Sequence, residues 1–589
     1  MLPGQRETEP ATAARYAAEG FWTGCPITEY LERAVASSPR RPAVVDDRFG
    51  SITYAALARQ VERLACGLLE LGFSRGDCFI VQLPNWHIFS VFHLALTAIG
   101  ALTVNVPVTY RQHELRSIVR ATGARGWVVP AAFRSFDYAG MVGALRPEWV
   151  SLRAVFVVGN AAGTPFVNYH DFMARPWERG GRRRTLDPLR PAPDEVTAVS
   201  FTSGTTGEPK GVMHTSNTFA AINVSVARAY GLTAEDVIFM AAPLGHSIGL
   251  MHGVRLALFL GGTLVLQEQW SPAGALGLIA RERASFTALA PPFLHDLVFD
   301  PALGAGGPPP AFRVCLCGGA FVSERLLRAA RERLPHTLST ALWGITEGIG
   351  TACRIGTAPA KLLATDGQPF PGSELKIAGP DGQELPRGRE GELLLRGPQV
   401  FVGYFGRPDL NAEAFLPDGF FRTGDLATMD GEGFLRITGR LKDIIVRGGV
   451  NISPVEIERA LAEDPRVERV AIVGMPDERL GERVCAFVVP RAGGTITLPE
   501  LAAIAERRGL AKHKWPERVE CVSHIPVTPS GKILRHVLKE WLSAGRAPTP
   551  QAASAPGPPA GEGHRGDAPS RTADPSEERA EGTRECDHG

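Results

Sequence analysis

The segment FTSGTTGEPKGVMHT, residues 201–215, concentrates hydroxyl side chains and glycines around one lysine, Lys210. In a turn between a strand and a helix, such residues direct backbone N–H groups and hydroxyls toward one point, which is how proteins hold phosphate oxygens. Gly204, Gly207 and Gly211 permit backbone angles and close approaches that a side chain would block. The segment therefore predicts a phosphate-binding loop between a strand and a helix.

The spacing within this loop excludes the common ATPase P-loop. That motif requires GxxxxGK followed by Ser or Thr, whereas here Gly204 is followed by Gly207 and then by Lys210 and Gly211. A merely flexible glycine-rich loop is the alternative that this segment alone leaves open. Other segments of the chain are needed to decide between the two.

The composition is that of a globular protein with more than one packed unit. At 589 residues and 63.2 kDa, the chain is too long for a single hydrophobic core. Its 63 Lys and Arg residues balance 62 Asp and Glu residues, a formal net charge of +1. Because no global charge attracts nucleic acid or an anionic membrane, we expect neither as a partner.

Nothing in the sequence predicts secretion or membrane insertion. The N-terminal MLPGQRETEPATAARYAAEG lacks the apolar core of a signal peptide, and the strongest apolar run, LALFLGGTLVL from Leu256, is too short to span a bilayer. We expect a soluble, cytoplasmic protein. Nine cysteines lie scattered without paired metal-ligand spacing. Cys315 and Cys317 are predicted to be buried thiols on one face of a strand.

Strand-like apolar runs alternate with helical patterns twice along the first 345 residues. From about Ile52 to Val212, runs such as CFIVQL and VFVVG alternate with patterns such as YAALARQVERLACGLLELG. A second stretch of this kind runs from VIFMAAPLG through FRVCLCGG. This alternation favours parallel sheets covered by helices. The fold class is therefore α/β, with two parallel-sheet subdomains in its N-terminal part.

Beyond about residue 345 the pattern changes twice. Short strands separated by the turn sequences PDG and DGEG predict a small antiparallel β-barrel or sheet. From about residue 441, helices and strands of a compact α+β unit follow, and the tail after Arg546 lacks every aromatic, Leu, Ile, Val and Met residue, so it cannot bury enough surface to order. The expected division is a flexible N-terminus at 1–19, a large domain at 20–439, a small domain at 440–545 and a disordered tail at 546–589.

Four further segments follow the glycine-rich loop. They are WGITE (343–347), FRTGD (421–425), GRLKDIIVRGGVNISPVEIE (439–458) and PVTPSGKILR (526–535). Together with TSGTTGEPKG, and in this order and spacing, they closely resemble the signature segments of the adenylate-forming superfamily. That superfamily includes acyl-CoA synthetases, aryl-acid ligases, luciferases and the adenylation domains of peptide synthetases. The resemblance covers about residues 20–543.

The resemblance implies an enzyme that joins a carboxylate to the α-phosphate of ATP, releases pyrophosphate and passes the acyl group to a thiol. Two unit charges about 4 Å apart repel by roughly 4 kcal/mol at an effective dielectric of 20, so positive groups are needed at the phosphates. Glu347 would hold Mg²⁺, Thr346 would contact the α-phosphate, and Trp343 would lie against adenine. Asp425 would accept the ribose hydroxyls, with Arg440 as a second contact. The rest of the implied ATP site comprises Thr202, Ser203, Gly204, Thr205, Thr206, Gly207, Lys210, Gly319 and Ala320.

The resemblance also implies a small C-terminal domain that moves between two reactions. Lys532 in PSGKILR would bridge the attacking carboxylate and the α-phosphate during adenylation. For the second reaction the domain would rotate about a hinge at Lys442 and bring the RGGVN loop into the site. There Gly449, next to Gly448, would line the passage for the pantetheine arm of CoA.

The segment MAAPLGHSIGLMHG (240–253) is similar to the acyl-pocket segment of the family. It contains no carboxylate, which amino-acid-activating relatives need to pair with the substrate ammonium, so an amino acid is not the expected substrate. Gly344 leaves open a position that acetate-specialised relatives fill with a bulky aromatic. His246 would face the substrate as a catalytic residue, with a structural histidine as the alternative. The implied acyl pocket comprises His246, Ser247, Gly249, Gly319 and Gly344.

We therefore expect an acyl-CoA synthetase that uses MgATP to activate a medium-chain, alicyclic or aromatic carboxylic acid and transfers it to CoA. An acid–AMP ligase that loads a carrier protein is the alternative, although GGVNISPVEIE looks more like the CoA-using branch. A catalytically silent nucleotide-binding protein is a third hypothesis. Loss of Lys532, Glu347 or Lys210 would have indicated it, and all three are present.

Overall fold

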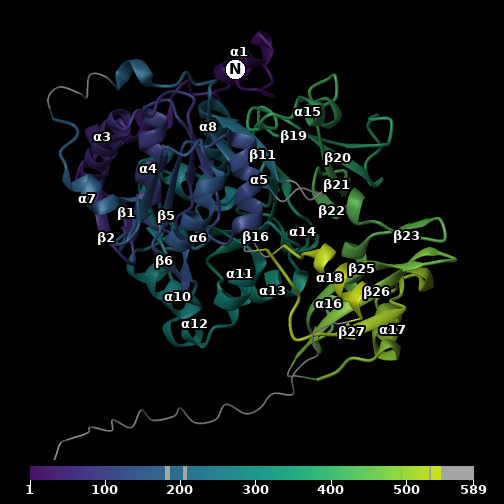
Figure 1. Ribbon diagram of the computed structural model, residues 1–589. Coiled ribbons are helices and arrows are strands. Elements are labelled where there is room, and N and C mark those ends of the chain that lie inside the picture. The colour runs from purple at the N-terminus through teal and green to yellow at the C-terminus, as the bar shows by residue number, and fades with distance from the viewer. Residues whose placement is uncertain (180–185, 203–208, 492–493, 529–531, 546–589) are drawn as a thin grey trace, which may run out of the picture.

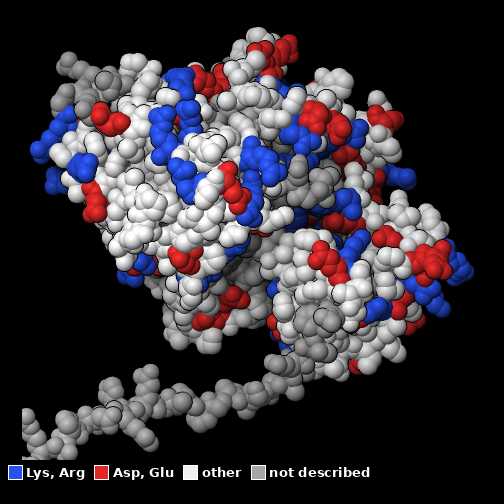
Figure 2. Space-filling model, in the orientation of Figure 1, with Lys and Arg blue, Asp and Glu red and all other residues white. Residues whose placement is uncertain are grey.

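The structure is a computed structural model whose described residues are 1–179, 186–202, 209–491, 494–528 and 532–545. Figure 1 shows one large body with a smaller antiparallel sheet at its side and a C-terminal unit next to that sheet. Figure 2 shows acidic and basic side chains interspersed on the face in view, in keeping with the near-zero net charge. The tail at 546–589, expected to be disordered, lies outside the described residues. None of the described helices is both long enough and apolar enough to cross a bilayer.

The first of two large sheets has seven strands in the order β11-β10-β4-β3-β5-β8-β9. Its neighbouring strands run parallel, except for the antiparallel pair β10 and β11. β5 is buried at every position, which is typical of a parallel strand covered on both faces. The strands are β3 Cys78–Val81, β4 Leu102–Asn105, β5 Gly126–Pro130, β8 Ala154–Val158, β9 Val167–Asn168, β10 Val196–Thr202 and β11 Lys210–Thr215.

The second large sheet has nine strands in the order β18-β17-β16-β15-β14-β12-β13-β1-β2. β1 pairs in parallel with β13, so a segment near the N-terminus joins the sheet made by the second stretch of the chain. Cys315 and Cys317 are both fully buried and belong to the same apolar cluster, which confirms the prediction for that strand. The strands are β1 Pro42–Asp46, β2 Gly50–Thr53, β12 Val237–Met240, β13 Thr263–Leu266, β14 Phe286–Leu289, β15 Val314–Gly318, β16 Leu338–Ile345, β17 Gly348–Ala352 and β18 Gln368–Pro369.

The main hydrophobic core lies between these two sheets. It includes Ile238 and Met240 of β12, whereas Phe239 packs on the opposite face, because successive strand side chains alternate. α4 is buried at every position from Ile88 to Ala98, as expected for a central helix. The helices of this core are α2 Ile27–Ser37, α3 Tyr54–Glu70, α4 His87–Ala98, α7 Tyr169–Ala174, α8 Ser216–Tyr230 and α9 Leu256–Leu260.

Other helices cover the outer faces of the sheets, so the expected α/β fold with helices on both sides is confirmed. On the seven-stranded sheet these are α5 Gln112–Thr122 and α6 Tyr138–Leu145. On the nine-stranded sheet they are α10 Pro272–Arg281, α11 Pro291–Phe299, α12 Pro301–Gly306, α13 Glu324–Arg333 and α14 Pro359–Ala364.

The first nineteen residues were expected to be flexible, and the structure contradicts this. Helix α1, Pro10–Ala18, buries Tyr16, whose ring packs edge-on against Trp22 at a centroid distance of 5.3 Å. The Arg6 backbone N–H donates to the carbonyl oxygen of Val402 at 2.7 Å. A polar segment is therefore ordered by two aromatic side chains and by backbone hydrogen bonds to the large domain.

A four-stranded antiparallel sheet, β19-β20-β21-β22, follows the two large sheets. The sequence predicted either a small antiparallel barrel or a sheet, and the structure contains an open sheet. Register places Asp425 of β21 opposite Arg440 of β22. The elements are β19 Glu374–Ala378, β20 Gly391–Arg396, α15 Pro408–Ala414, β21 Phe421–Met429 and β22 Leu435–Arg440.

The C-terminal unit is a five-stranded sheet with helices on both faces. β22 ends at Arg440, and a 3-10 turn, Leu441–Asp443, leads into this unit. We propose that the boundary between the large and the small domain lies at Arg440, as the sequence indicated. Ser453 Oγ donates to the carbonyl oxygen of Thr438, which ties the unit to the large domain. Its elements are β23 Ile445–Arg447, β24 Val450–Ile452, α16 Pro454–Ala462, β25 Val467–Asp477, β26 Gly481–Pro490, α17 Leu498–Arg507, β27 Arg518–Cys521 and α18 Arg535–Ala544.

Candidate active site

The glycine-rich loop closes a β-hairpin. Thr202 at the end of β10 pairs with Lys210 at the start of β11, and α8 begins only at Ser216. The expected strand–loop–helix arrangement is therefore wrong, because an antiparallel strand follows the loop. Ser203, Gly204, Thr205, Thr206 and Gly207 lie outside the described residues.

Gly211 has a packing role in this hairpin. A Cβ atom at this position would lie 2.9 Å from Val199 Cγ1 and 3.2 Å from Phe405 Cβ. The missing side chain therefore lets β11 pack closely against its neighbours, and the expected role in loop geometry is not needed to explain this glycine.

Glu347 lies in the turn between β16 and β17 with cations nearby. Tyr404 Oη donates to Glu347 Oε1 at 2.8 Å, and Lys210 Nζ lies 5.1 Å from the centroid of the Tyr404 ring. Burial raises the pKa of Glu347, while the Tyr404 hydrogen bond and the charges of Arg440 and Lys210 oppose this. The sequence analysis missed Tyr404, which lies 57 residues away from Glu347 in the chain.

Thr346 is held by residues of two other segments. Its carbonyl oxygen accepts a hydrogen bond from His214 Nε2 at 2.8 Å, and its Oγ1 donates to Ser247 Oγ at 3.3 Å. Burial lowers the pKa of His214 to about 4, so the ring is neutral and its proton is on Nε2. His214 was also missed, although it belongs to the segment quoted first.

Asp425 is almost fully buried, with two partners. Trp343 Nε1 donates to Asp425 Oδ2 at 2.9 Å, and Arg440 Nε lies 2.7 Å from Asp425 Oδ1. Trp343 is also buried, in an apolar cluster with residues of the antiparallel sheet such as Leu393 and Leu395. The indole therefore orients the carboxylate, a contact that the sequence did not indicate. Contact of Trp343 with adenine stays a prediction.

Lys532 reaches this site from the small domain. Its backbone N–H donates to Thr528 Oγ1 at 3.0 Å, which holds the end of the loop in place. Burial, together with the nearby positive charges of Arg440 and Lys442, lowers the pKa of Lys532 to about 8, while Asp425 opposes the shift. A residue at position 532 thus shares one electrostatic environment with the pair Asp425–Arg440.

His246 lies within electrostatic range of the same lysine. Burial and the charge of Lys532 lower the pKa of His246 to about 4, so the ring is neutral near pH 7. The Ile248 backbone N–H donates to His246 Nδ1 at 3.3 Å, which places the ring proton on Nε2. Ser247 is buried beside it.

A seven-residue π-helix, Gly249–Arg255, follows His246. Such helices are rare and occur frequently at functional sites. A Cβ at Gly249 would lie 2.3 Å from the carbonyl oxygen of Pro243, so backbone packing requires this glycine and its small size does not signal substrate space. A Cβ at Gly344 would come no closer than 3.5 Å to Ile349 Cα, an ordinary contact, so that position does leave room.

Gly319 and Ala320 follow β15 as expected from the sequence. Gly319 has φ +83°, a left-handed conformation that glycine adopts without strain, and it is exposed. Ala320 is half-buried. The left-handed backbone conformation explains why residue 319 is a glycine. That Gly319 and Ala320 belong to the ATP site, and Gly319 also to the acyl pocket, stays a prediction.

The π-helix contributes two buried polar residues that sequence analysis missed. His252 Nδ1 has no hydrogen-bond partner among the described residues, and burial lowers the pKa of His252 to about 4. Arg255 Nε donates to His93 Nε2 and Nη2 donates to Thr197 Oγ1, both at 3.2 Å. Its guanidinium carbon lies 3.7 Å from the centroid of the Phe219 ring.

The expected hinge residue lies close to this cluster, since its charge acts on Lys532, whereas the expected CoA residues lie at a hairpin tip. Lys442 is exposed in the 3-10 turn between β22 and β23. Gly448 and Gly449 form the exposed tip of the β23–β24 hairpin, with φ +57° and +81°. A two-residue hairpin turn of this type needs positive φ at both positions, so local conformation already favours glycine there.

The site fits a magnesium ion that arrives with ATP. In the described part of the chain, no three or more His, Cys, Asp or Glu side chains are grouped to hold a metal. Mg²⁺ retains several waters and is bound by one or two carboxylates plus substrate phosphates, so Glu347 beside Lys210 is a sufficient protein contribution.

Family comparisons agree with this arrangement. The model for AMP-binding enzymes matches residues 31–405, and the model for the AMP-binding enzyme C-terminal domain matches residues 456–532. The chain belongs to the adenylate-forming superfamily. This adenylate-forming enzyme therefore uses ATP and Mg²⁺ to activate an acid, which excludes an unrelated glycine-rich loop at residues 201–215.

Relatives of the enzyme include both CoA ligases and carrier-protein-loading ligases. It is 35% identical to a medium-chain fatty-acid–CoA ligase of Escherichia coli (strain K12), over 90% of this chain and 92% of that one. It is 34% identical to a salicyl-AMP ligase / salicyl-S-ArCP synthetase of Mycobacterium tuberculosis, over 91% and 94%. The amide bond synthetase McbA from Marinactinospora thermotolerans has a similar structure, with a TM-score of 0.76, 31% identity and coverage of 88% and 100%.

Proposed function

We propose that this enzyme is an AMP-forming acyl-CoA synthetase for a medium-chain, alicyclic or aromatic carboxylic acid. The observation that carries the proposal is the position of Lys532. A lysine of the small domain lies in one electrostatic environment with Arg440 and Asp425 of the antiparallel sheet and with His246 of the large domain. This is the arrangement that adenylation of a carboxylate requires.

In the first reaction, a carboxylate oxygen of the acid attacks the α-phosphorus of ATP. The bond from that phosphorus to the bridging oxygen breaks, and pyrophosphate leaves with the electron pair. Lys532 and Lys210 offset the repulsion between the two anions, and Asp425 and Arg440 hold the ribose. Mg²⁺ held by Glu347 would add positive charge at the phosphates when bound.

His246 positions the acid. Its ring is neutral near pH 7 and its Nδ1 is occupied by the Ile248 backbone N–H, so Nε2–H is the donor that remains for a carboxylate oxygen. Because a buried neutral donor adds no charge, it fixes the orientation of the acid while Lys532 supplies the charge.

The acyl pocket supports a substrate larger than acetate. Gly344 places no side chain across the pocket, and no carboxylate lies between Met240 and Gly253 to pair with an amino acid.

In the second reaction, the small domain rotates about Lys442 and a thiol attacks the acyl carbon, so that AMP leaves. CoA is the proposed acceptor, supported by the similarity to the fatty-acid–CoA ligase. A carrier protein is the second candidate, supported by the nearly equal identity to the salicyl-S-ArCP synthetase.

The test is AMP release from MgATP by the purified enzyme with acetate, octanoate, cyclohexanecarboxylate, benzoate, salicylate and amino acids, each with and without CoA. CoA-dependent AMP and thioester with one class of apolar acid is the expected result. Pyrophosphate exchange without CoA turnover would redirect the search to a carrier protein. Silence with every acid, while the protein is folded, would contradict the proposal.

A further inference from the structure

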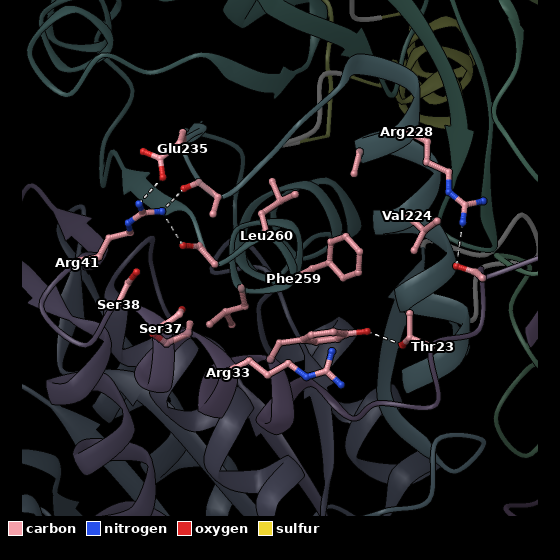
Figure 3. Close-up of a pocket in the computed structure, with 17 residues that line it drawn as sticks. Thr23, Arg33, Ser37, Ser38, Arg41, Val224, Arg228, Glu235, Phe259 and Leu260 are labelled. Atoms are coloured by element: carbon pink, nitrogen blue, oxygen red, sulfur yellow. Dashed lines mark hydrogen bonds and ion pairs between the residues drawn. The ribbon is translucent and has the colours of Figure 1, made fainter.

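A second pocket lies between α2, α8 and α9, apart from the candidate active site. Its volume is about 770 Å³, within the range of small-molecule sites. None of its lining residues belongs to the candidate site described above. We call it the α2/α8/α9 pocket (Figure 3).

The middle of the α2/α8/α9 pocket is apolar. Tyr30 and Phe259 pack edge-on at a centroid distance of 5.2 Å, and Leu260 and Val224 add aliphatic surface. Figure 3 shows Phe259 and Leu260 between Arg41 at one end and Arg228 at the other. This surface suits a chain or ring, not a fully polar ligand.

The two ends of the pocket differ in charge. At one end, Arg41 lies 2.5 Å from Glu235, so its charge is balanced. Arg33 likewise lies 2.5 Å from Glu29, so the ends differ through Arg228, which Figure 3 shows opposite Arg41 and which forms no ion pair with a described carboxylate. Arg228 Nη2 donates to the carbonyl oxygens of Glu19 and Gly20, which anchors the guanidinium through one of its three nitrogens. Since a guanidinium has five N–H donors, most of them remain for a ligand.

A buried cation lies within electrostatic range of Tyr30, which lines the pocket. This cation, Arg255, forms no ion pair with any described carboxylate. Its hydrogen-bond partners are the neutral His93 and Thr197. A positive charge without a counter-charge acts over a longer range in the low-dielectric interior than in water, so it favours an anion in the adjacent pocket.

We propose that the α2/α8/α9 pocket is a second ligand site that binds an amphipathic carboxylate. The carboxylate lies between Arg33 and Arg228, and the apolar body lies over Tyr30 and Phe259. α9 continues directly from the π-helix that follows His246, so an occupant contacts the same continuous helical segment as the acyl pocket. The site does not depend on which acid the enzyme activates.

The test uses a diazirine derivative of octanoic acid, irradiated with the full-length protein in the absence of ATP and CoA. Cross-linked peptides are identified by mass spectrometry. The expected result is labelling of residues 256–261, in addition to any label at 240–253. Excess octanoate should suppress this label at least fivefold, whereas octanol, which lacks the charge, should not.

Two variants and one control make the assignment specific. Arg33→Gln combined with Arg228→Gln should reduce the label at 256–261 at least fivefold, and Ala227→Trp should fill the pocket with the same effect. Arg328→Gln is the control, because Arg328 pairs with Glu324 four residues before it, as Arg33 does with Glu29. The proposal would be overturned if the label were confined to residues 240–253, or if octanol suppressed it as strongly as octanoate does. It would also be overturned if the variant with both Arg33→Gln and Arg228→Gln kept the full label at 256–261. The cross-linking experiment contains no nucleotide. Its result can therefore be interpreted even if the protein lacks the proposed ligase activity.

Discussion

Arg459 of the small domain forms an ion pair with Asp366 of the large domain, with Nη2 3.7 Å from Oδ2. The same guanidinium carbon lies 4.9 Å from the centroid of the Phe321 ring. Asp366 is fixed in turn by the Ile437 backbone N–H, which donates to Oδ2 at 2.8 Å. Burial lowers the pKa of Arg459 to about 10, so the residue stays charged at neutral pH. This ion pair stabilises the orientation of the small domain in which Lys532 lies within electrostatic range of Asp425 and Arg440.

Replacement of Arg459 by Ala should therefore weaken adenylation selectively. We expect pyrophosphate exchange to fall about tenfold, equivalent to about 1.4 kcal/mol for a partly buried ion pair. Thioester formation from pre-made acyl-AMP should be unchanged or faster. Arg466→Ala is the control, because Arg466 pairs with Asp464 inside the small domain. Equal losses in both half-reactions would show that the pair does not select between domain orientations.

Lys532→Ala should reduce adenylation at least a hundredfold and leave thioester formation from acyl-AMP within a few-fold of the parent enzyme. The pKa of Lys532 is lowered to about 8, so the protonated lysine is complete below that pH and is lost above it. Adenylation kcat/KM should thus fall as the pH rises through about 8. Lys532→Arg keeps its charge and should remove this fall. Pyrophosphate exchange between pH 6 and pH 10 measures both effects, and the same fall in the arginine variant would assign the titration elsewhere.

Trp343→Phe should raise the KM for ATP about tenfold with little change in kcat. The substitution removes the N–H that holds Asp425, and a hydrogen bond to a charged group is worth about 1.5 kcal/mol or more. Trp127→Phe is a matched control, since the buried Trp127 Nε1 has no described partner. A normal KM in the Trp343 variant would remove the indole from the orientation of Asp425.

Gly344→Trp should change the acid preference from octanoate or benzoate toward acetate by at least tenfold. An added Cβ at this position meets only ordinary contacts, and a thermal melt checks that the whole indole is accommodated. Gly249→Ala should instead lower the apparent Tm by several degrees, because its Cβ meets a backbone oxygen and overpacking of this kind costs about 1–3 kcal/mol. Specific activity across the acid panel and thermal melts distinguish the two. A stable Gly344 variant with unchanged preference would exclude this position from the pocket.

Gly449→Leu should preserve adenylate formation and reduce CoA thioesterification at least tenfold. Backbone strain is a competing cause, since Gly449 has positive φ. Gly433→Leu controls for it, because Gly433 has the same φ of +81° and likewise no atom within 4 Å of an added Cβ. Parallel losses in both variants would indicate strain alone, and unchanged CoA turnover in the Gly449 variant would show that the hairpin tip does not line the passage.

The alternation of apolar runs with helical patterns along the chain was enough to predict the fold class. Apolar runs such as GWVVP are buried as parallel strands, and Cys315 and Cys317 share one buried face. The glycine-rich loop was assigned the wrong context, because the last part of the segment 201–215, KGVMHT, forms a strand before the helix begins. The N-terminal helix was missed because its order depends on contacts with Val402 and Pro398, far away in the chain.

The sequence by itself determined the family and the reaction class, since both are carried by short motifs whose residues are neighbours in the chain. Only the tertiary structure decided that Trp343 and Arg440 hold Asp425, that Tyr404 donates to Glu347 and that the charge of Lys532 acts on His246. It also decided that Arg255 is buried within electrostatic range of Tyr30 in a second pocket, without a carboxylate partner among the described residues. These relationships arise when sheets and domains pack and bring together side chains from distant segments, and no spacing along the chain encodes such distances.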